Sequence, residues 1–146
     1  MSSPSSVLFA CTLNAVRSPM AAALYMREAG PLVRVASAGV LAGLPDPYAA
    51  AVMDEIGIDI CDHEPRCFRD LSDNAFDLVI TLSPEAHRYA QEHFRGTVSH
   101  IEYWPAPEVS AIAATLPRQE AANLYRELRD QLLEKITAHL SADRTR

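Results

Sequence analysis

The sequence lacks the features of several large classes of protein. No apolar run reaches the roughly 18 residues that a membrane-spanning helix needs, and Lys and Arg form no cluster in a chain whose formal net charge is −6. Neither a membrane nor a nucleic acid is therefore an expected partner. The first six residues also lack the basic segment that opens a signal peptide. Together these absences predict a cytoplasmic protein.

Cysteine is also scarce. The chain has three cysteines, Cys11, Cys61 and Cys67, and this odd number does not suggest a disulfide framework but fits a reducing compartment. The histidines show no ligand-like spacing with cysteines or carboxylates; they are His63, His87, His93, His100 and His139. We therefore expect neither a metal site nor a cofactor.

What the chain does contain is an alternation of apolar and amphipathic segments. Its 146 residues, 49% of them hydrophobic, can bury the core of a single domain over residues 1–146 without disulfides or metal, with frayed ends at 1–5 and 141–146. The pattern predicts strands at 7–10, 32–37, 76–82 and 97–103, and helices at 19–28, 46–57, from 83 onward and at 118–140. This order predicts an α/β fold, a parallel sheet with helices on both faces and a ligand site at the carboxyl ends of the strands.

The most informative segment follows the first strand, where Cys11 and Arg17 flank five residues. The backbone N–H groups of such a loop, together with the N-terminus of the next helix, can surround an oxyanion. Arg17 adds a planar fork that binds two oxygens at once. The same positive field favours the thiolate form of Cys11, which is the nucleophilic form of cysteine. The segment therefore predicts a phosphate-binding loop with a reactive sulfur beneath it.

Three neighbouring residues support this interpretation. Asn14 tolerates the left-handed conformation that a tight loop needs. Ser18 is placed both to cap the next helix and to hydrogen-bond a thiolate, and Pro19 stands at the favoured first helical position. A buried structural cysteine in a strand-to-helix turn is the alternative, but it does not require this combination of residues.

The motif CTLNAVRSPM at residues 11–20 resembles the signature of the low-molecular-weight protein tyrosine phosphatases, a family that also includes thioredoxin-coupled arsenate reductases. The resemblance continues through VASAG, GIDICDHEPR, FDLVITL and a Trp-Pro segment before the last helix. It implies a four-stranded parallel sheet and a two-step reaction. The thiolate attacks phosphorus to give a cysteinyl-phosphate, water hydrolyses this intermediate, and a carboxylic acid protonates the leaving oxygen and later activates the water.

The resemblance also implies a role for each matching position. Cys11 would be the nucleophile, Arg17 would bind the phosphoryl oxygens, and Ser18 would hydrogen-bond the departing thiolate. The loop itself would comprise Thr12, Leu13, Asn14, Ala15, Val16 and Ser18.

Two further residues match family positions behind the loop. Ser37 and His63 would hydrogen-bond Asn14 and Ser18 and so fix the loop's shape. The plainer interpretations are a turn serine at Ser37 and a surface histidine at His63.

The general acid is where the sequence departs most from the family, which has an aspartate-proline pair after the fourth strand. If Glu108-Val109 aligns with that pair, the acid survives as a glutamate; if Ala106-Pro107 does, the acid is lost. We favour Glu108 because no other carboxylate lies in the segment after Trp104. Glu108 could also simply be the N-terminal acid of the following helix.

The pocket rim departs as well. Leu13 stands where many relatives have glycine, Val16 stands where many have a second cysteine, and the tyrosines that often follow the acid are absent after Glu108. The wall of the pocket is therefore expected from other side chains, namely Leu41, Leu44, Tyr48, Tyr103 and Trp104. A packing role in the core is an equal alternative for Trp104.

These observations predict a phosphomonoester hydrolase of the tyrosine phosphatase type, a monomer or weak dimer. Its expected partners are a phosphorylated protein or small phosphomonoester as substrate and inorganic phosphate as product. One alternative is a non-catalytic module that binds phosphate or phosphoproteins. The other is a thiol-coupled arsenate reductase; because its family uses two cysteines near the end of the third strand, where this chain has none, Cys61 and Cys67 are expected to be spectators.

Overall fold

A computed structural model of the protein describes residues 4–144. It contains four strands, β1 (Ser6–Cys11), β2 (Arg34–Gly39), β3 (Leu78–Thr81) and β4 (His100–Tyr103). The helices are α1 (Arg17–Ala29), α2 (Pro47–Asp54), α3 (Pro84–His93), α4 (Ser110–Ala113) and α5 (Arg118–Arg144), and a single 3-10 turn, η1, spans Phe68–Asp70. Within residues 4–144, no helix is long and apolar enough to cross a membrane.

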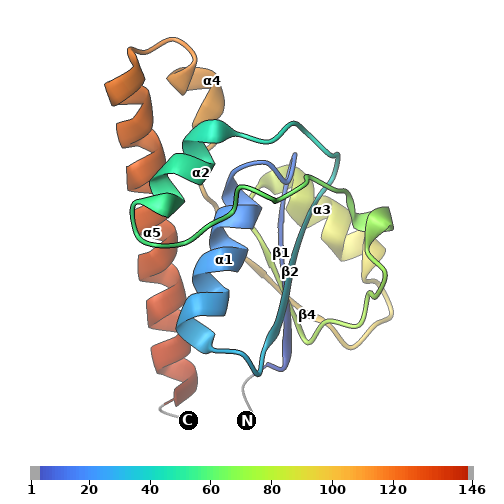
Figure 1. The fold of residues 1–146 in the computed structure, drawn as a ribbon. Coiled ribbons are helices and arrows are strands. Elements are labelled where there is room, and N and C mark those ends of the chain that lie inside the picture. The colour runs from blue at the N-terminus through green and yellow to red at the C-terminus, as the bar shows by residue number, and fades with distance from the viewer. Residues whose placement is uncertain (1–3, 145–146) are drawn as a thin grey trace.

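The strands form one parallel sheet in the order β2-β1-β3-β4. Figure 1 shows α1, α2 and α5 on one side of this sheet and α3 on the other. The predicted fold, a four-stranded parallel sheet flanked by helices on both faces, is thus confirmed. Because all strands are parallel, their carboxyl ends share one edge, and the central strand β1 ends there at Cys11, opposite Gly39 of β2.

The side chains of β1 point alternately into two hydrophobic cores, one on each face of the sheet. Val7 and Phe9 face the larger core, which α1, α2 and α5 cover, whereas Leu8 and Ala10 face a smaller core beneath α3. Every residue of β1 is buried, and full burial of an aliphatic or aromatic side chain contributes about 1.5–3 kcal/mol. Burial on both faces holds the strand that leads into Cys11.

Helix starts follow the predicted local chemistry at two places. Asp46 caps α2 by accepting hydrogen bonds from the N–H groups of Tyr48 and Ala49, and proline follows it at the first helical position. Ser83 caps α3 in the same manner, through the N–H of Ala86. α4 and η1 were not predicted from the sequence, because they are too short to show a periodic pattern.

The strand boundaries differ from the prediction at exposed turns. β2 begins at Arg34 rather than at residue 32, because Leu32 lies in a turn with 94% of its surface exposed. β4 begins at His100, because the Thr97 hydroxyl bonds back to the Phe94 carbonyl and forms a turn before the strand. An apolar residue in the sequence therefore did not show whether its position belongs to the turn or to the start of the strand.

Parts of the two ends that were expected to fray have contacts or secondary structure. Ser5 is held by Asp77, whose Oδ2 accepts from the Ser5 N–H at 2.8 Å and from its hydroxyl at 2.7 Å. At the other end α5 continues to Arg144 instead of ending at residue 140. The remaining residues of those predicted ends, 1–3 and 145–146, lie outside the described part of the chain.

Glu55, just after α2, links that helix to α5. Its carboxylate accepts from Arg126 at 2.7 Å and from Arg129 at 2.8 Å. These hydrogen bonds lower the pKa of Glu55 from 4.5 to about 2. Arg126 and Arg129 therefore connect α5 to the end of α2. Both helices contribute residues to the wall of the main pocket.

We expect Glu55→Gln to destabilise the protein at neutral pH but not in strong acid. A carboxyl whose pKa is lowered by folding stabilises the folded state above its unfolded pKa, and this contribution disappears as pH falls through the folded value. Urea unfolding of wild type and variant should therefore differ at pH 7, and the gap should close between about pH 4.5 and about 2. The exposed Glu134→Gln on α5 is the control; a Glu55→Gln gap that persists unchanged at pH 2 would contradict the prediction.

Candidate active site

Cys11 lies at the end of β1 with 2% of its surface exposed. Its Sγ is 2.9 Å from the hydroxyl oxygen of Ser18, and that oxygen accepts a hydrogen bond from Asn14 Nδ2 at 2.8 Å. Because Asn14 donates to this oxygen, the Ser18 hydroxyl proton is free to point at the sulfur.

Ser18 reaches the sulfur because it is not the helix cap that the sequence suggested. α1 begins at Arg17, its N-cap is Val16, and no side chain caps it. Pro19 is consequently the third residue of the helix rather than the first. The tertiary contacts with Cys11 and Asn14 determine the position of Ser18 instead of the local capping preference.

The carbonyl groups of the loop after Cys11 are bonded on its outer side. The N–H groups of Val40, Leu41 and Gly43 donate to the carbonyls of Cys11, Thr12 and Leu13 at 2.9–3.1 Å. Within residues 4–144, no protein group accepts from the N–H groups of residues 13–16. A loop with bonded carbonyls and free N–H groups has the polarity of an anion-binding nest.

Asn14 holds this loop in shape. Its φ of 54° is the left-handed conformation that the sequence predicted, and its side chain is fully buried. Nδ2 also donates to Ser37 Oγ at 2.9 Å, and Oδ1 accepts from the N–H of Arg66 at 3.0 Å. His63 Nε2 donates to the Asn14 carbonyl at 2.8 Å.

The expected partners behind the loop are thus only partly as predicted. Ser37 contacts Asn14 as expected, whereas His63 contacts the Asn14 backbone and not Ser18. Arg66, which the sequence did not indicate as a partner of the loop, also bonds the Ser37 carbonyl through Nε. Arg66 bonds Asn14 through its backbone N–H. The pattern of side chains in a sequence does not indicate such a backbone contact.

Arg17 is nearly buried and its guanidinium is fixed at two points. Nη1 donates to the Ala106 carbonyl at 3.1 Å and Nη2 to Thr12 Oγ1 at 3.4 Å. The Thr12 hydroxyl in turn lies 3.0 Å from Ser83 Oγ and 3.2 Å from Glu85 Oε1. The guanidinium is therefore held beside the loop by segments that follow β3 and β4.

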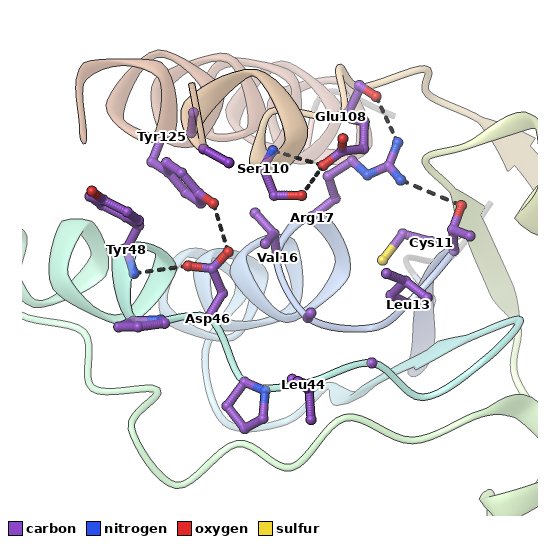
Figure 2. Close-up of a pocket in the computed structure, with 18 of the residues that line it drawn as sticks. Cys11, Leu13, Val16, Arg17, Leu44, Asp46, Tyr48, Glu108, Ser110 and Tyr125 are labelled. Atoms are coloured by element: carbon purple, nitrogen blue, oxygen red, sulfur yellow. Dashed lines mark hydrogen bonds between the residues drawn. The ribbon is translucent and has the colours of Figure 1, made fainter. Parts of the chain in front are cut away.

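Cys11, Arg17 and Glu108 line one pocket of about 1060 Å³ at this edge of the sheet (Figure 2). The other lining residues come from the loop, the segment before α2 and the first residues of α2, the start of α3, the segment between β4 and α4, α4 with its C-cap, and α5; they are Thr12, Leu13, Ala15, Val16, Gly43, Leu44, Pro45, Asp46, Pro47, Tyr48, Pro84, Glu85, Ala106, Ser110, Ala113, Ala114 and Tyr125. Within the described chain, no group of three or more His, Cys, Asp or Glu side chains is placed to hold a metal ion.

Several of the predicted rim residues do not line this pocket. Leu44 and Tyr48 do, but Leu41, Tyr103 and Trp104 do not. Trp104 packs edge-on against Phe9 in the larger core, the alternative role considered for it.

The other two rim predictions are wrong for different reasons. The Tyr103 ring stacks on His87 at 4.8 Å between centroids. Leu41 contributes its backbone N–H to the loop carbonyl of Thr12, while its side chain is exposed outside the pocket.

Tyr125 and Asp46 form a wall that the sequence analysis missed. The Tyr125 hydroxyl donates to Asp46 Oδ2 at 2.6 Å, and its ring stacks on Tyr48 with centroids 5.1 Å apart. Burial, and then the bond to Asp46, raise the pKa of Tyr125, so its hydroxyl stays protonated. These residues are 79 positions apart in the chain, and only the helical stripe of α5 could have indicated that Tyr125 faces inward.

Glu108 fits both interpretations that the sequence allowed. Its Oε1 accepts from the Ser110 N–H at 2.7 Å and from the Ser110 hydroxyl, and Oε2 accepts from the Ala111 N–H at 3.3 Å. Burial raises its pKa, but these hydrogen bonds and the charge of Arg17 outweigh burial, and the net pKa is lowered. Glu108 thus binds the N-terminus of α4 and also lines the pocket near Arg17.

Cys61 and Cys67 do not line the pocket. Cys61 is exposed, and a hydrogen bond with Asp59 raises the pKa of its thiol. The Cys67 thiol donates to Asp70 at 3.1 Å. Their expected spectator role stays a prediction.

Comparison with known proteins identifies the family. The family model described as low molecular weight phosphotyrosine protein phosphatase matches residues 6–144. The chain belongs to this family. The probable low molecular weight protein-tyrosine-phosphatase EpsP of Ralstonia solanacearum is 41% identical over 88 residues, which cover 58% of the chain and 60% of EpsP. The chain therefore spans about three fifths of the length of EpsP.

Other relatives cover nearly the whole chain. An arsenate reductase of Bacillus licheniformis is 31% identical over 137 residues, 92% of the chain and 94% of that protein. Among solved structures, the tyrosine phosphatase AmsI of Erwinia amylovora has a TM-score of 0.74 at 19% identity, with 96% and 93% coverage, and supports the fold alone. The YwlE arginine phosphatase of Geobacillus stearothermophilus has a TM-score of 0.73 at 25% identity, covering 97% of the chain and 94% of that structure.

We expect Gly39→Ala to distort the loop of this phosphatase-family member. A Cβ at Gly39 would lie 2.5 Å from the Leu41 carbonyl oxygen and 2.8 Å from the Asn14 nitrogen, so backbone must move, at a cost of about 1–3 kcal/mol. The variant should lose the protection that inorganic phosphate gives Cys11 against iodoacetamide, measured by mass spectrometry of the Cys11 peptide.

The matched control is Gly96→Ala. At Gly96, φ is +78° and nothing lies within 4 Å of an added Cβ, so alanine there strains the backbone by about 1–2 kcal/mol without touching the loop. Gly96→Ala should lower stability but keep phosphate protection. If phosphate protects Cys11 from iodoacetamide equally well in both variants, the close packing of Gly39 against the loop is not needed for phosphate binding, and the prediction is refuted.

Proposed function

We propose that this protein hydrolyses phosphomonoesters, and phosphotyrosyl proteins in particular, through a covalent intermediate on Cys11. The observation that carries the proposal is the surroundings of the Cys11 sulfur. It lies at the base of a loop with free N–H groups, receives the Ser18 hydroxyl at 2.9 Å, and shares its pocket with Arg17. Such an arrangement stabilises both a thiolate and a phosphoryl group above it.

In the first step, the Cys11 thiolate attacks phosphorus. A P–S bond forms, the P–O bond to the substrate alcohol breaks, and the electron pair leaves with that oxygen. The loop N–H groups and the Arg17 guanidinium bind the other phosphoryl oxygens, whose charge they stabilise in the transition state. Because Arg17 is already fixed by the Ala106 carbonyl and Thr12, little ordering of its side chain is needed on binding.

In the second step, water attacks phosphorus and the P–S bond breaks. Glu108 accepts the proton of the attacking water, and inorganic phosphate is released. The sulfur leaves as a thiolate, which the Ser18 hydroxyl stabilises. Glu108 is assigned this role because it lines the pocket beside Arg17 and its lowered pKa keeps it ionised.

The pocket volume supports a substrate with a sizeable group on the phosphate. About 1060 Å³ is available, and the walls beyond Cys11 are largely apolar or aromatic, with Leu13, Leu44 and Tyr48 among them. This accommodates an aromatic ring on the phosphate oxygen. The name of EpsP, a probable protein-tyrosine-phosphatase, agrees with that substrate class.

Arsenate reduction is the second candidate, because an arsenate reductase matches nearly the full length of the chain at 31% identity. Arsenate has the shape and charge of phosphate and suits the same loop. Since Cys61 and Cys67 lie outside the pocket, an external thiol would have to supply the reducing electrons.

The decisive experiment is turnover of p-nitrophenyl phosphate at about pH 6 by wild type, Cys11→Ser and Glu108→Gln. We expect Cys11→Ser to abolish turnover and Glu108→Gln to reduce kcat by about 10²-fold or more, the usual loss when an acid–base group is removed. Cys61→Ser and Cys67→Ser are matched controls that should retain turnover.

The other outcomes identify the alternatives. Absence of wild-type turnover, while phosphate still protects Cys11 from alkylation, would refute the hydrolase and indicate a phosphate-binding module. Arsenite production from arsenate and an external thiol, dependent on Cys11, would instead support the reductase.

A further inference from the structure

Three exposed leucines gather at the mouth of the pocket. Leu13 of the loop is 45% exposed, and Leu41 and Leu44, in the segment that follows β2, are 58% and 84% exposed. Backbone hydrogen bonds hold that segment against the loop. The Leu41 N–H donates to the Thr12 carbonyl, and the Gly43 N–H donates to the Leu13 carbonyl two residues further on. Single exposed leucines are common on soluble proteins, whereas a contiguous apolar patch commonly marks a site of interaction.

Gly43 makes room for Leu13 at this mouth. A Cβ added at Gly43 would lie 2.9 Å from the Cβ of Leu13, so leucine fits in the loop because residue 43 has no side chain. Leu13 and Leu44 line the pocket, and Leu41 lies just outside it. Figure 2 shows Leu13 and Leu44 across the pocket from Glu108. The leucines thus form one apolar edge, which we call the leucine rim (Leu13, Leu41 and Leu44).

The rest of the mouth carries negative charge. Within the described part of the chain, the carboxylates of Asp46, Glu85 and Glu108 line the pocket, and Arg17 is its only lining cation. In the proposed reaction Arg17 binds the phosphoryl oxygens, so its charge is balanced there. Arg88 lies 4.0 Å from Glu85 at the exposed surface and offsets that carboxylate alone. The part of a substrate beyond its phosphate therefore meets apolar side chains and negative charge.

We propose that the leucine rim binds the polypeptide beside the phosphorylated residue, so that the protein selects phosphotyrosyl segments with apolar neighbours and disfavours those with acidic neighbours. This deepens the proposed hydrolase function and rests on it. The occupant is the substrate polypeptide because the rim is continuous with the pocket that holds Cys11. When a phosphotyrosyl side chain reaches Cys11, the residues on either side of it come to the mouth and lie against the rim.

Contact with the rim and repulsion by the carboxylates respond differently to salt. An apolar side chain that the rim covers on one face gains about half of what full burial supplies, which corresponds to about tenfold in kcat/KM. Added salt does not weaken such a contact. Repulsion between exposed charges is screened, since the Debye length falls from about 10 Å at 0.1 M ionic strength to about 3 Å at 1 M. Ionic strength therefore separates the two contributions.

The test measures kcat/KM of wild type for phosphotyrosyl peptides that differ only in the residues beside the phosphotyrosine, which are leucine, serine or glutamate. Because the leaving group is the same tyrosine in each peptide, differences in kcat/KM report contacts of the neighbours. We expect the leucine peptide to exceed the serine peptide by about tenfold, and the glutamate peptide to fall below the serine peptide. At about 1 M salt the glutamate peptide should approach the serine peptide, while the advantage of leucine remains.

Leu41→Asn and Leu44→Asn test the rim, and Leu32→Asn is the matched control. Leu32 is also an exposed leucine, but it lies in the turn before β2, whereas the rim follows the other end of that strand. The quantity compared is the ratio of kcat/KM for the leucine peptide to kcat/KM for the serine peptide. This ratio does not depend on how much of a variant is folded. It should fall in both rim variants and stay at the wild-type value in Leu32→Asn.

Three results would refute the inference while the hydrolase stands. In the first, wild type cleaves all the peptides with equal kcat/KM. In the second, Leu32→Asn lowers the ratio as much as the rim variants do. In the third, the rim variants convert a dimer into a monomer in analytical ultracentrifugation without changing the ratio, which would make the rim an interface between two copies of the chain.

Failure of the hydrolase itself gives a different result. If wild type turns over neither p-nitrophenyl phosphate nor any of the peptides, the proposed hydrolase is refuted. Binding of fluorescently labelled peptides to wild type, measured by anisotropy, then decides the inference on its own. Tighter binding of the leucine peptide than of the serine peptide would support the inference, and equal binding would refute it.

Discussion

The close approach of the segment 39–43 to the loop after Cys11 is the constraint on which the candidate site depends. Three N–H groups of that segment bond the carbonyls of Cys11, Thr12 and Leu13, and an atom beyond Cα at Gly39 would collide with the loop backbone. With its carbonyls bonded outside, the loop can present N–H groups to a single point. The parallel pairing of β1 and β2, which ends at Cys11 and Gly39, brings the two segments together.

Asn14 completes this arrangement from within the loop. Its side chain bonds Ser18, Ser37 and the Arg66 backbone, and its carbonyl bonds His63. All of these contacts are made between protein groups, so the loop is shaped before any anion arrives. Preorganised dipoles need no reorganisation during a reaction, and the same network directs the Ser18 hydroxyl at the Cys11 sulfur.

Features that depend on local chemistry could be predicted from the sequence. The alternation of segments gave the α/β sheet, and Asp46-Pro47 and Ser83-Pro84 marked helix starts that the structure confirms. The left-handed Asn14 followed from its residue type. Ser18 shows the limit of this reasoning, because a serine before proline suits a helix cap, yet Ser18 is the second residue of α1 and bonds Cys11 and Asn14.

Features that depend on which side of an element faces the pocket could not be predicted. Trp104 follows β4 and packs into the core on Phe9, while Tyr125, far along α5, lines the pocket through Asp46. Trp104 has no neighbour in sequence that reveals its orientation, and for Tyr125 only the helical stripe of α5 indicates that the side chain faces inward. The family alignment also could not decide whether Glu108 is an acid or a helix cap, because the two roles share one carboxylate.

The use of the Glu108 carboxylate both in the pocket and as a cap of α4 has a physical consequence. α4 has four residues, and so short a helix does not persist on its own hydrogen bonds. Glu108 supplies bonds to its first N–H groups, while Ala113 anchors it in the larger core that α5 also lines. Moving the carboxylate toward a substrate oxygen would remove those bonds from α4. The attacking water takes the position opposite the Cys11 sulfur that the leaving oxygen vacates, so both proton transfers would make the same demand on the Glu108 carboxylate and on α4.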